Sequence, residues 1–365
     1  MTSRAGLVVK RESTYLTLYK SKILMDITNK ILANKVETKT NDNWVEKLWR
    51  WADENNIEDL HSVEKGFNKK YNRGMPRDKK TLLNLEELNL YNYDLTYLPK
   101  EICNLTKITK LHLYKNRLST LPKEIKNLVN LTELSISKNN LSKLPNEIGA
   151  LKNLEVLSVL GNKLTQLPKE IGNLTSLIKL NVLGNKLKFI PDEICQLNKL
   201  ASLSLFDNEL FELPHNIGNL ESLTELLVNN NALTKLPSSI GKLKNLEYLW
   251  IYENKLDSIP VEIGNLKKLT DLWMYENKLT KLPEEIGVLV NLKELWVSRN
   301  QLTSLPEAIG NLRELEQFNL SKNKLLHLPK QILNLKKLTW LEVDKNVAIP
   351  SELDTLVSRK VINFA

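Results

Sequence analysis

Apolar residues recur along most of this chain with a period of 23 residues. The stretch Leu154–Ser176 reads "LEVLSVLGNKLTQLPKEIGNLTS" and fits the template L-x-x-L-x-L-x-x-N-x-L-x-x-L-P-x-x-I-x-x-L-x-x. Eleven full copies, with Ile, Val, Met or Phe at some Leu positions, run from Leu85 to Lys337, and a twelfth begins at Leu338 and breaks down after Asn346. A fixed period of this length predicts a repeat architecture, in which one small unit is stacked on copies of itself.

The two halves of each copy predict different backbones. In "EVLSVLG" the core positions alternate with variable ones, which is the side-chain period of a β-strand. In "LPKEIGNL" the apolar residues Leu167, Ile171 and Leu174 are three or four residues apart, which suits 3₁₀ or short helical turns. One strand and one turn cannot bury an apolar side alone, so the copies are expected to share a core with their neighbours.

The prolines keep the same phase as the leucines. One stands in each full copy: Pro99, Pro122, Pro145, Pro168, Pro191, Pro214, Pro237, Pro260, Pro283, Pro306 and Pro329. In its L-x-x-L-x-L-x-x-N-x-L half the chain resembles leucine-rich repeat proteins, and its LP-x-x-I-x-x-L half is similar to the short-repeat bacterial type and the Ras-suppressor-type intracellular proteins. The resemblance covers residues 82–346 and implies an α/β solenoid, or horseshoe, with a parallel sheet of about twelve strands on its concave face and 3₁₀ turns on its convex face.

An asparagine stands at position 9 of nearly every copy, counted from the first Leu, where the strand ends. The column comprises Asn116, Asn139, Asn162, Asn185, Asn208, Asn231, Asn254, Asn277, Asn300, Asn323 and Asn346. A buried amide both donates and accepts, so it can satisfy backbone groups that leave the strand ladder. The column is therefore predicted to be scaffold, and Tyr93, which replaces Asn in the first copy, predicts a less regular first turn.

Three tryptophans recur at position 5, which strand alternation places on the solvent side of the concave sheet. Positions 4 and 6 are predicted to face the core, and positions 3, 5 and 7 to face away from it. We call the outward-facing aromatic residues at positions 5 and 7 of three successive copies the aromatic ladder: Trp250, Tyr252, Trp273, Tyr275 and Trp296. Apolar residues lead into it along a diagonal of Leu160, Leu183, Phe206 and Leu227, and Tyr248 and Trp340 at position 3 flank it.

This aromatic ladder has two interpretations. Rings on neighbouring strands lie ~4.8 Å apart, so the ladder could simply stiffen the sheet. Binding is favoured, because the outer faces and edges of five large rings are expected to stay in water and Trp and Tyr dominate interface hot spots. The predicted partner-binding residues are Trp250, Trp273, Trp296, Tyr252, Tyr275, Tyr248, Phe206, Leu227, Leu183 and Leu160.

Charge bears on the class of partner. The formal net charge is +9, and residues 1–80 hold most of it, with 17 Lys and Arg against 11 Asp and Glu. The rim of the aromatic ladder carries both signs, with carboxylates such as Asp271, Glu276 and Glu294 beside Lys255, Lys278 and Arg299. The carboxylates would repel phosphate, so a nucleic-acid partner is disfavoured. Lysines gather toward the first copies, where they indicate either a solvated face or a site for an acidic segment.

The ends of a solenoid expose its core, so atypical caps are expected. Residues 43–60 predict an amphipathic helix with Trp44, Leu48, Trp49 and Ala52 on one face, capped by Asn41, Asp42 or Asn43. The predicted organisation is a basic, partly mobile segment at 1–42, a helical cap at 43–81, repeats at 82–346 and a C-terminal cap at 347–365. Ser351 and Asp354 are candidate caps of a short last helix.

No catalytic or metal-binding constellation is predicted. His61, His112, His215 and His327 occupy unrelated positions, and Cys103 and Cys195 lie four copies apart, too far for a disulfide. Glycine motifs for nucleotides are absent from the sequence, so no cofactor is expected. The sequence shows no transmembrane segment or signal-peptide core, which favours the cytoplasm while leaving delivery outside the cell open.

The sequence thus predicts a non-enzymatic module that binds a protein or peptide on its concave face. A structural role, self-association into a homodimer through the same aromatic surface, is the alternative from another class. A delivered bacterial effector or virulence-associated binding protein would be a different context for the same chemistry.

Overall fold

The structure, a computed structural model, describes residues 43–60 and 73–365. The chain divides into two compact units, Met1–Glu54 and Asn55–Ala365. The expectation for residues 1–42, including the caps Asn41 and Asp42, falls outside the described residues. The predicted domain boundaries stay predictions.

Residues 43–54 of the first unit form a helix, shorter than the one predicted for 43–60. It ends before Asn56, whose φ of 52° is the left-handed conformation that Asn tolerates after a helix. The predicted buried face is partly wrong: Leu48 and Ala52 are buried, but Val45 and Trp51 accompany them instead of Trp44 and Trp49. Neither this helix nor any other in the described ranges is long and apolar enough to cross a bilayer.

Every repeat of the second unit carries a short strand at positions 3 to 5, extended to position 6 in the last repeat, and one further strand follows the repeats. The strands are β1 (Glu87–Asn89), β2 (Lys110–His112), β3 (Glu133–Ser135), β4 (Val156–Ser158), β5 (Lys179–Asn181), β6 (Ser202–Ser204), β7 (Glu225–Leu227), β8 (Tyr248–Trp250), β9 (Asp271–Trp273), β10 (Glu294–Trp296), β11 (Gln317–Asn319), β12 (Trp340–Val343) and β13 (Ile362–Phe364). They form one parallel sheet in sequence order, paired in register so that each position meets the same position of the next repeat.

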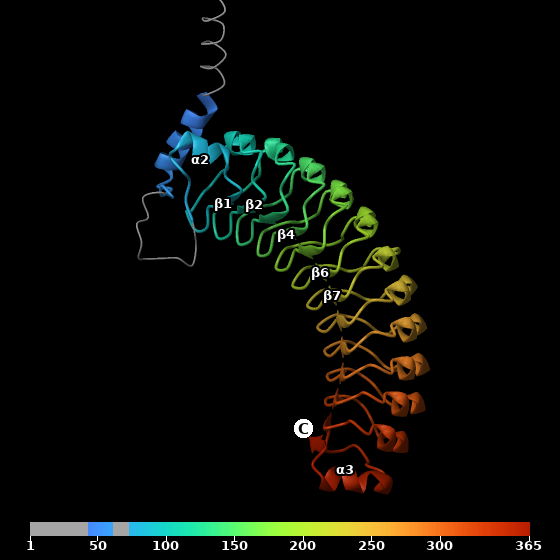
Figure 1. The fold of residues 1–365 in the computed structure, drawn as a ribbon. Helices are drawn as coiled ribbons and strands as arrows, with labels where there is room; N and C mark the ends of the chain where they lie inside the picture. Colours follow the sequence, from blue (N-terminus) through green and yellow to red (C-terminus); the bar gives the residue numbers. More distant parts are fainter. Residues whose placement is uncertain (1–42, 61–72) are drawn as a thin grey trace, which may run out of the picture. The chain divides into compact units, whose positions relative to one another are not determined.

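A 3₁₀ helix follows the proline of each repeat, as the spacing of its apolar residues predicts. The helices are η1 (Lys100–Asn104), η2 (Lys123–Asn127), η3 (Asn146–Ala150), η4 (Lys169–Asn173), η5 (Asp192–Gln196), η6 (Ile217–Asn219), η7 (Ser238–Lys242), η8 (Val261–Asn265), η9 (Glu284–Val288), η10 (Glu307–Asn311), η11 (Lys330–Asn334) and η12 (Ser351–Leu353). Within Asn55–Ala365 the strands line the inner side of a curved stack and the η helices its outer side (Figure 1). The predicted solenoid with 3₁₀ turns is therefore confirmed.

The core lies between these two layers. Leu180 at position 4, Val182 at position 6 and Ile171 in η4 are all fully buried. The predicted inward positions are therefore confirmed, and each repeat closes the core of its neighbours.

The asparagine column forms the predicted hydrogen-bond ladder. Asn208 Nδ2 donates to the carbonyls of Val182 and Leu205, at 3.1 and 2.9 Å, and its Oδ1 accepts from Leu187 N at 3.0 Å. At the last step the prediction is wrong, because Asn346 is exposed. Nearby, the Asp344 carboxylate accepts from the backbone N–H groups of residues 322 and 323, at 2.8 and 3.1 Å. In earlier repeats the equivalent N–H groups donate to backbone carbonyls of the next repeat.

The first edge of the sheet is covered by residues 57–60 and 73–77 of the second unit. Gly74 N donates to Asn89 O of β1, and Met75 N donates to Glu58 O, both at 2.9 Å. Gly74 has a φ of +132°, and a Cβ there would lie 2.5 Å from Glu58 O, so this close approach requires glycine. Helix α2 (Lys79–Leu83), capped by Asp78 at Thr81 N, then leads into β1. The first turn is less regular, as predicted, because Asp94 at position 10 has a φ of 57°, whereas position 10 of the other repeats has no left-handed residue.

The last edge is covered by a strand that the sequence analysis missed. Helix α3 (Asp354–Ser358) turns the chain back, and β13 pairs with β12 in parallel. The predicted caps are wrong, because neither Ser351 nor Asp354 makes a side-chain capping bond: Pro350 and Leu353 occupy the two N-cap positions.

Candidate aromatic site on the concave face

The in-register sheet brings the tryptophans of the aromatic ladder face to face. Trp250 pairs with Trp273 across β8 and β9, and Trp273 with Trp296 across β9 and β10. The first pair stacks with ring centroids 4.4 Å apart and planes 1° apart, whereas the second pair is tilted by 44° at 5.7 Å. Trp340 continues the series, 5.7 Å from the ring of Trp296.

The tyrosines at position 7 form a second, parallel stack. The rings of Tyr252 and Tyr275 lie 4.3 Å apart with planes 10° apart, and Tyr252 also meets Trp273 at 6.3 Å. Burial raises the pKa of Tyr275 far above its ordinary value, and the Tyr252 hydroxyl and the carboxylates of Glu253 and Glu276 raise it further. The ladder is therefore one connected aromatic surface with negative charge beside it.

The ladder is half-buried by its own stacking. All five of its rings keep intermediate exposure, and Leu160, Leu183 and Phe206 of the diagonal do so as well. Leu227 departs from the expectation, because its neighbours leave only 8% of it exposed, and Tyr248 is the most open at 39%. The structure thus brings the predicted residues together, with Leu227 serving as buried support.

The indole N–H groups of the ladder are unequally satisfied. Trp273 Nε1 donates to Glu294 Oε2 at 3.1 Å. Trp250 Nε1 and Trp296 Nε1 are buried without an acceptor among the described residues, and Asn229 Oδ1, two residues after β7, is buried without a donor among them. Such groups cost stability, because a buried polar group that loses water without gaining a partner is unfavourable.

Position 8, directly after the tyrosine column, is held in a left-handed backbone. Glu253 and Glu276 have φ of 52° and 54°, a conformation that is uncommon outside glycine, and Arg299 of the next repeat has 54°. This turn was not among the features predicted from the sequence, although Gly161 and Gly184 at the same position were the available signal. The turn fixes where these charged side chains leave the backbone at the edge of the ladder.

The earlier strands of the same face carry a different set of groups. Tyr91 and Tyr114 stack at 5.4 Å, and Lys138 Nζ lies 5.6 Å from the centre of the Tyr114 ring. His112 lies between Glu87 and Glu133, 3.6 and 3.9 Å from their carboxylate oxygens. The Tyr114 ring is therefore already covered by a cation of the chain itself.

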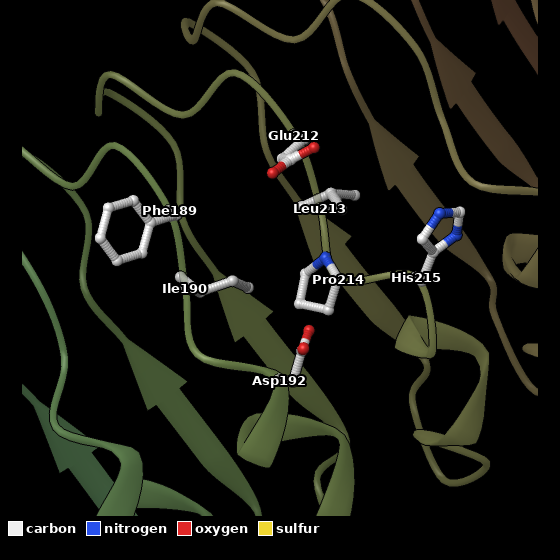
Figure 2. Close-up of a pocket in the computed structure, with 7 residues that line it drawn as sticks. All are labelled: Phe189, Ile190, Asp192, Glu212, Leu213, Pro214 and His215. Atoms are coloured by element: carbon white, nitrogen blue, oxygen red, sulfur yellow. The ribbon is translucent and has the colours of Figure 1, made fainter.

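A separate pocket of about 200 Å³ lies between two successive repeats, away from the ladder positions. Phe189, Ile190 and Asp192 come from one repeat, and Glu212, Leu213, Pro214 and His215 from the next (Figure 2). Figure 2 shows the Asp192 carboxylate below the Pro214 ring, with Phe189 and His215 at opposite ends of the group. The pocket occurs where η6 is three residues long and the other η helices from η1 to η11 are five.

The pocket's acidic and histidine side chains do not form a metal site. In the part of the chain that the structure describes, no three His, Cys, Asp or Glu side chains are placed to hold a metal ion. Both cysteines are free and buried, and burial raises the pKa of Cys103 to about 12 and of Cys195 to about 11. Such thiols stay protonated at neutral pH and are poor nucleophiles.

Comparison with known proteins identifies the scaffold. A family model described as a leucine-rich repeat region matches residues 122–211, 191–300 and 280–363. The chain belongs to the leucine-rich repeat family. A search of curated proteins returns no match.

Solved structures of other leucine-rich repeat proteins agree with this assignment. A leucine-rich repeat protein of Leptospira interrogans is 37% identical, with a TM-score of 0.55, over 79% of this chain and 86% of its own. A plant peptide hormone receptor, RGFR1 in complex with RGF2, is 30% identical, with a TM-score of 0.59, over 72% of this chain and 49% of its own. An internalin of Listeria monocytogenes, 24% identical with a TM-score of 0.61 over 78% of this chain and 88% of its own, shares the fold. In the plant receptor the leucine-rich repeat fold belongs to a peptide hormone receptor that was solved in complex with RGF2.

Proposed function

We propose that this leucine-rich repeat protein is a non-enzymatic module that binds a protein or peptide partner on its concave face, over the aromatic ladder. The observation that carries the proposal is the ladder itself, in which Trp and Tyr rings stack on an open sheet face and keep part of their surface exposed. Aromatic rings of this kind supply large contact area at low entropic cost and are enriched among interface hot spots. The plant receptor relative supports the proposal, since its structure holds RGF2.

The indole N–H groups that lack a hydrogen-bond acceptor in the described ranges favour a binding role for the ladder over sheet stiffening alone. A leucine or phenylalanine at position 5 would stiffen the sheet without burying an N–H group, yet Trp250 and Trp296 each bury one that has no acceptor among the described residues. Local rules that a natural sequence breaks at a cost to stability are typically broken at functional sites. The ladder therefore carries more polarity than a purely structural stack requires.

The test selects peptides from a phage-displayed library of random sequences on the full chain and measures their affinity for variants. Trp273→Ala is the central variant, because Trp273 has a tryptophan on both sides. Loss of a central aromatic anchor is expected to weaken binding by about thirty- to a thousandfold. Ser135→Ala, at position 5 of β3, is the matched control and should leave affinity unchanged.

Two results would contradict the proposal. One is a set of selected peptides that bind Trp273→Ala and the wild type equally well per folded molecule. The other is a dimer in light scattering that Trp273→Glu converts to monomer, because self-association would then occupy the ladder.

A further inference from the structure

The charges beside the aromatic ladder change sign along the concave face. Positions 3 and 8 lie on either side of the ladder positions along each strand. In β7 to β10 and the turns after them these positions carry the acidic rows, which are Glu225, Asp271, Glu294, Glu253 and Glu276. The same positions of β2 to β5 carry Lys110, Lys115, Lys138 and Lys179, with Glu133 as the one carboxylate.

Within these acidic rows the chain has one cation, Arg299, and its guanidinium is already paired with a carboxylate. Arg299 Nη1 lies 3.0 Å from Glu276 Oε1, which leaves the other carboxylates of the rows without an ion-pair partner among the described residues. Asp271 bonds to the hydroxyl of Thr270, and Glu294 accepts the Trp273 indole, so both remain acceptors with spare lone pairs. Positions 3 and 8 of these repeats therefore carry a net negative charge, which favours a cation beside the ladder.

The earlier repeats show how this face accommodates a cation on an aromatic ring. Lys138, at position 8, lies over Tyr114 of the preceding repeat. The equivalent residue for Tyr252 is Glu276, so a carboxylate stands where the lysine would be. Among the described residues no Lys or Arg lies over any ring of the ladder, and a cation there must come from a partner.

We propose that the partner of the ladder is a cationic peptide segment, whose arginine or lysine side chains lie over the aromatic rings between the acidic rows. This inference rests on the proposed function and names its partner class. Arginine suits the site best, because a planar guanidinium stacks on an indole face while its N–H groups bond to carboxylates at the rim. The lysines over β2 to β5 would repel the same segment, which sets where on the face it binds.

The experiment examines the charge of the peptides selected on the full chain and measures their affinity by fluorescence anisotropy. Enrichment of arginine and lysine is expected, with affinity falling several-fold between about 50 and 300 mM NaCl. Asp271→Asn and Glu253→Gln, which remove one charge each beside the ladder, are expected to weaken binding about two- to fivefold. Glu133→Gln, at position 3 of β3, removes a carboxylate outside the acidic rows and should change nothing.

The outcomes separate this inference from the proposed function. Neutral or acidic peptides that depend on Trp273 would overturn the cationic partner and leave binding on the ladder intact. Basic peptides that bind Trp273→Ala as tightly as the wild type would overturn both. A selection that enriches no peptide would also contradict both.

Discussion

Replacing single tryptophans of the ladder by phenylalanine should have opposite effects on stability at neighbouring positions. Trp250 and Trp273 stack on one another, but Trp250 buries an indole N–H without an acceptor among the described residues, whereas Trp273 donates to Glu294. Phenylalanine keeps a ring in the stack and removes the N–H group. Comparing the stability of Trp250→Phe with that of Trp273→Phe therefore isolates the contribution of the Trp273–Glu294 hydrogen bond.

The magnitudes follow from two contributions. Phenylalanine buries about 40 Å² less apolar surface than tryptophan, a loss of up to about 1 kcal/mol in each variant. Removing an unpaired buried N–H recovers about 1–3 kcal/mol in Trp250→Phe, so this variant should be neutral or more stable than the wild type. Removing a donor to a carboxylate costs about 1.5–3 kcal/mol in principle, and less here because Glu294 keeps partial exposure, so Trp273→Phe should be destabilised by roughly 1–3 kcal/mol.

Urea unfolding followed by far-ultraviolet circular dichroism measures both variants, because the transition midpoint reports loss of the backbone structure, with each variant's own folded and unfolded baselines. The slope of the unfolding free energy against urea must match the wild type for the comparison to hold. Equal destabilisation of Trp250→Phe and Trp273→Phe would refute the reasoning, since it would show that the unpaired N–H has no cost. Trp296→Phe serves as the replicate, because its Nε1 is also buried without an acceptor among the described residues.

The remaining predictions concern the scaffold. Leu180→Ala should lower the unfolding free energy by about 2–5 kcal/mol through a core cavity, and an unchanged melting curve would contradict the assignment of position 4 to the core. Asn208→Ala removes four side-chain bonds to backbone groups and should cost at least about 2 kcal/mol in urea unfolding, whereas exposed Asn346→Ala should cost little. Because burial raises the pKa of Cys103 from 9.0 to about 12, the folded state holds this proton between those pH values while the unfolded state loses it, so stability should fall as pH rises through that window. Cys103→Ala should show a smaller fall in melting temperature between about pH 9 and pH 11.

The 23-residue pattern alone determined most of the scaffold. Strand alternation places Leu180 inward and Trp273 outward, and the spacing of Leu167, Ile171 and Leu174 implies a short turn, because each rule acts within one repeat. The asparagine column could be interpreted for the same reason, since a buried amide at a strand end has few ways to satisfy its bonds. Periodicity then extends the local result along the whole stack.

The ends could not be predicted in this way, because there the period stops and contacts between distant segments take over. The strand β13 exists because α3 turns the chain back onto β12, and the pairing of Gly74 with β1 depends on the close approach of Glu58. At the last repeat the Asp344 carboxylate accepts from the backbone N–H groups of residues 322 and 323, where earlier repeats use backbone carbonyls, and Asn346 is exposed. None of these contacts leaves a periodic signal.

Part of the candidate site could be predicted from the sequence, and part depended on the tertiary structure. The sequence by itself determined which rings share a face, because an in-register parallel sheet sets position 5 beside position 5 in every repeat. Only the tertiary structure decided how far the rings cover one another, that Leu227 is buried by its neighbours, and that one indole finds Glu294 while two find no acceptor among the described residues. The physical reason is that burial and hydrogen bonding depend on side-chain orientation between strands, which spacing along one chain does not specify.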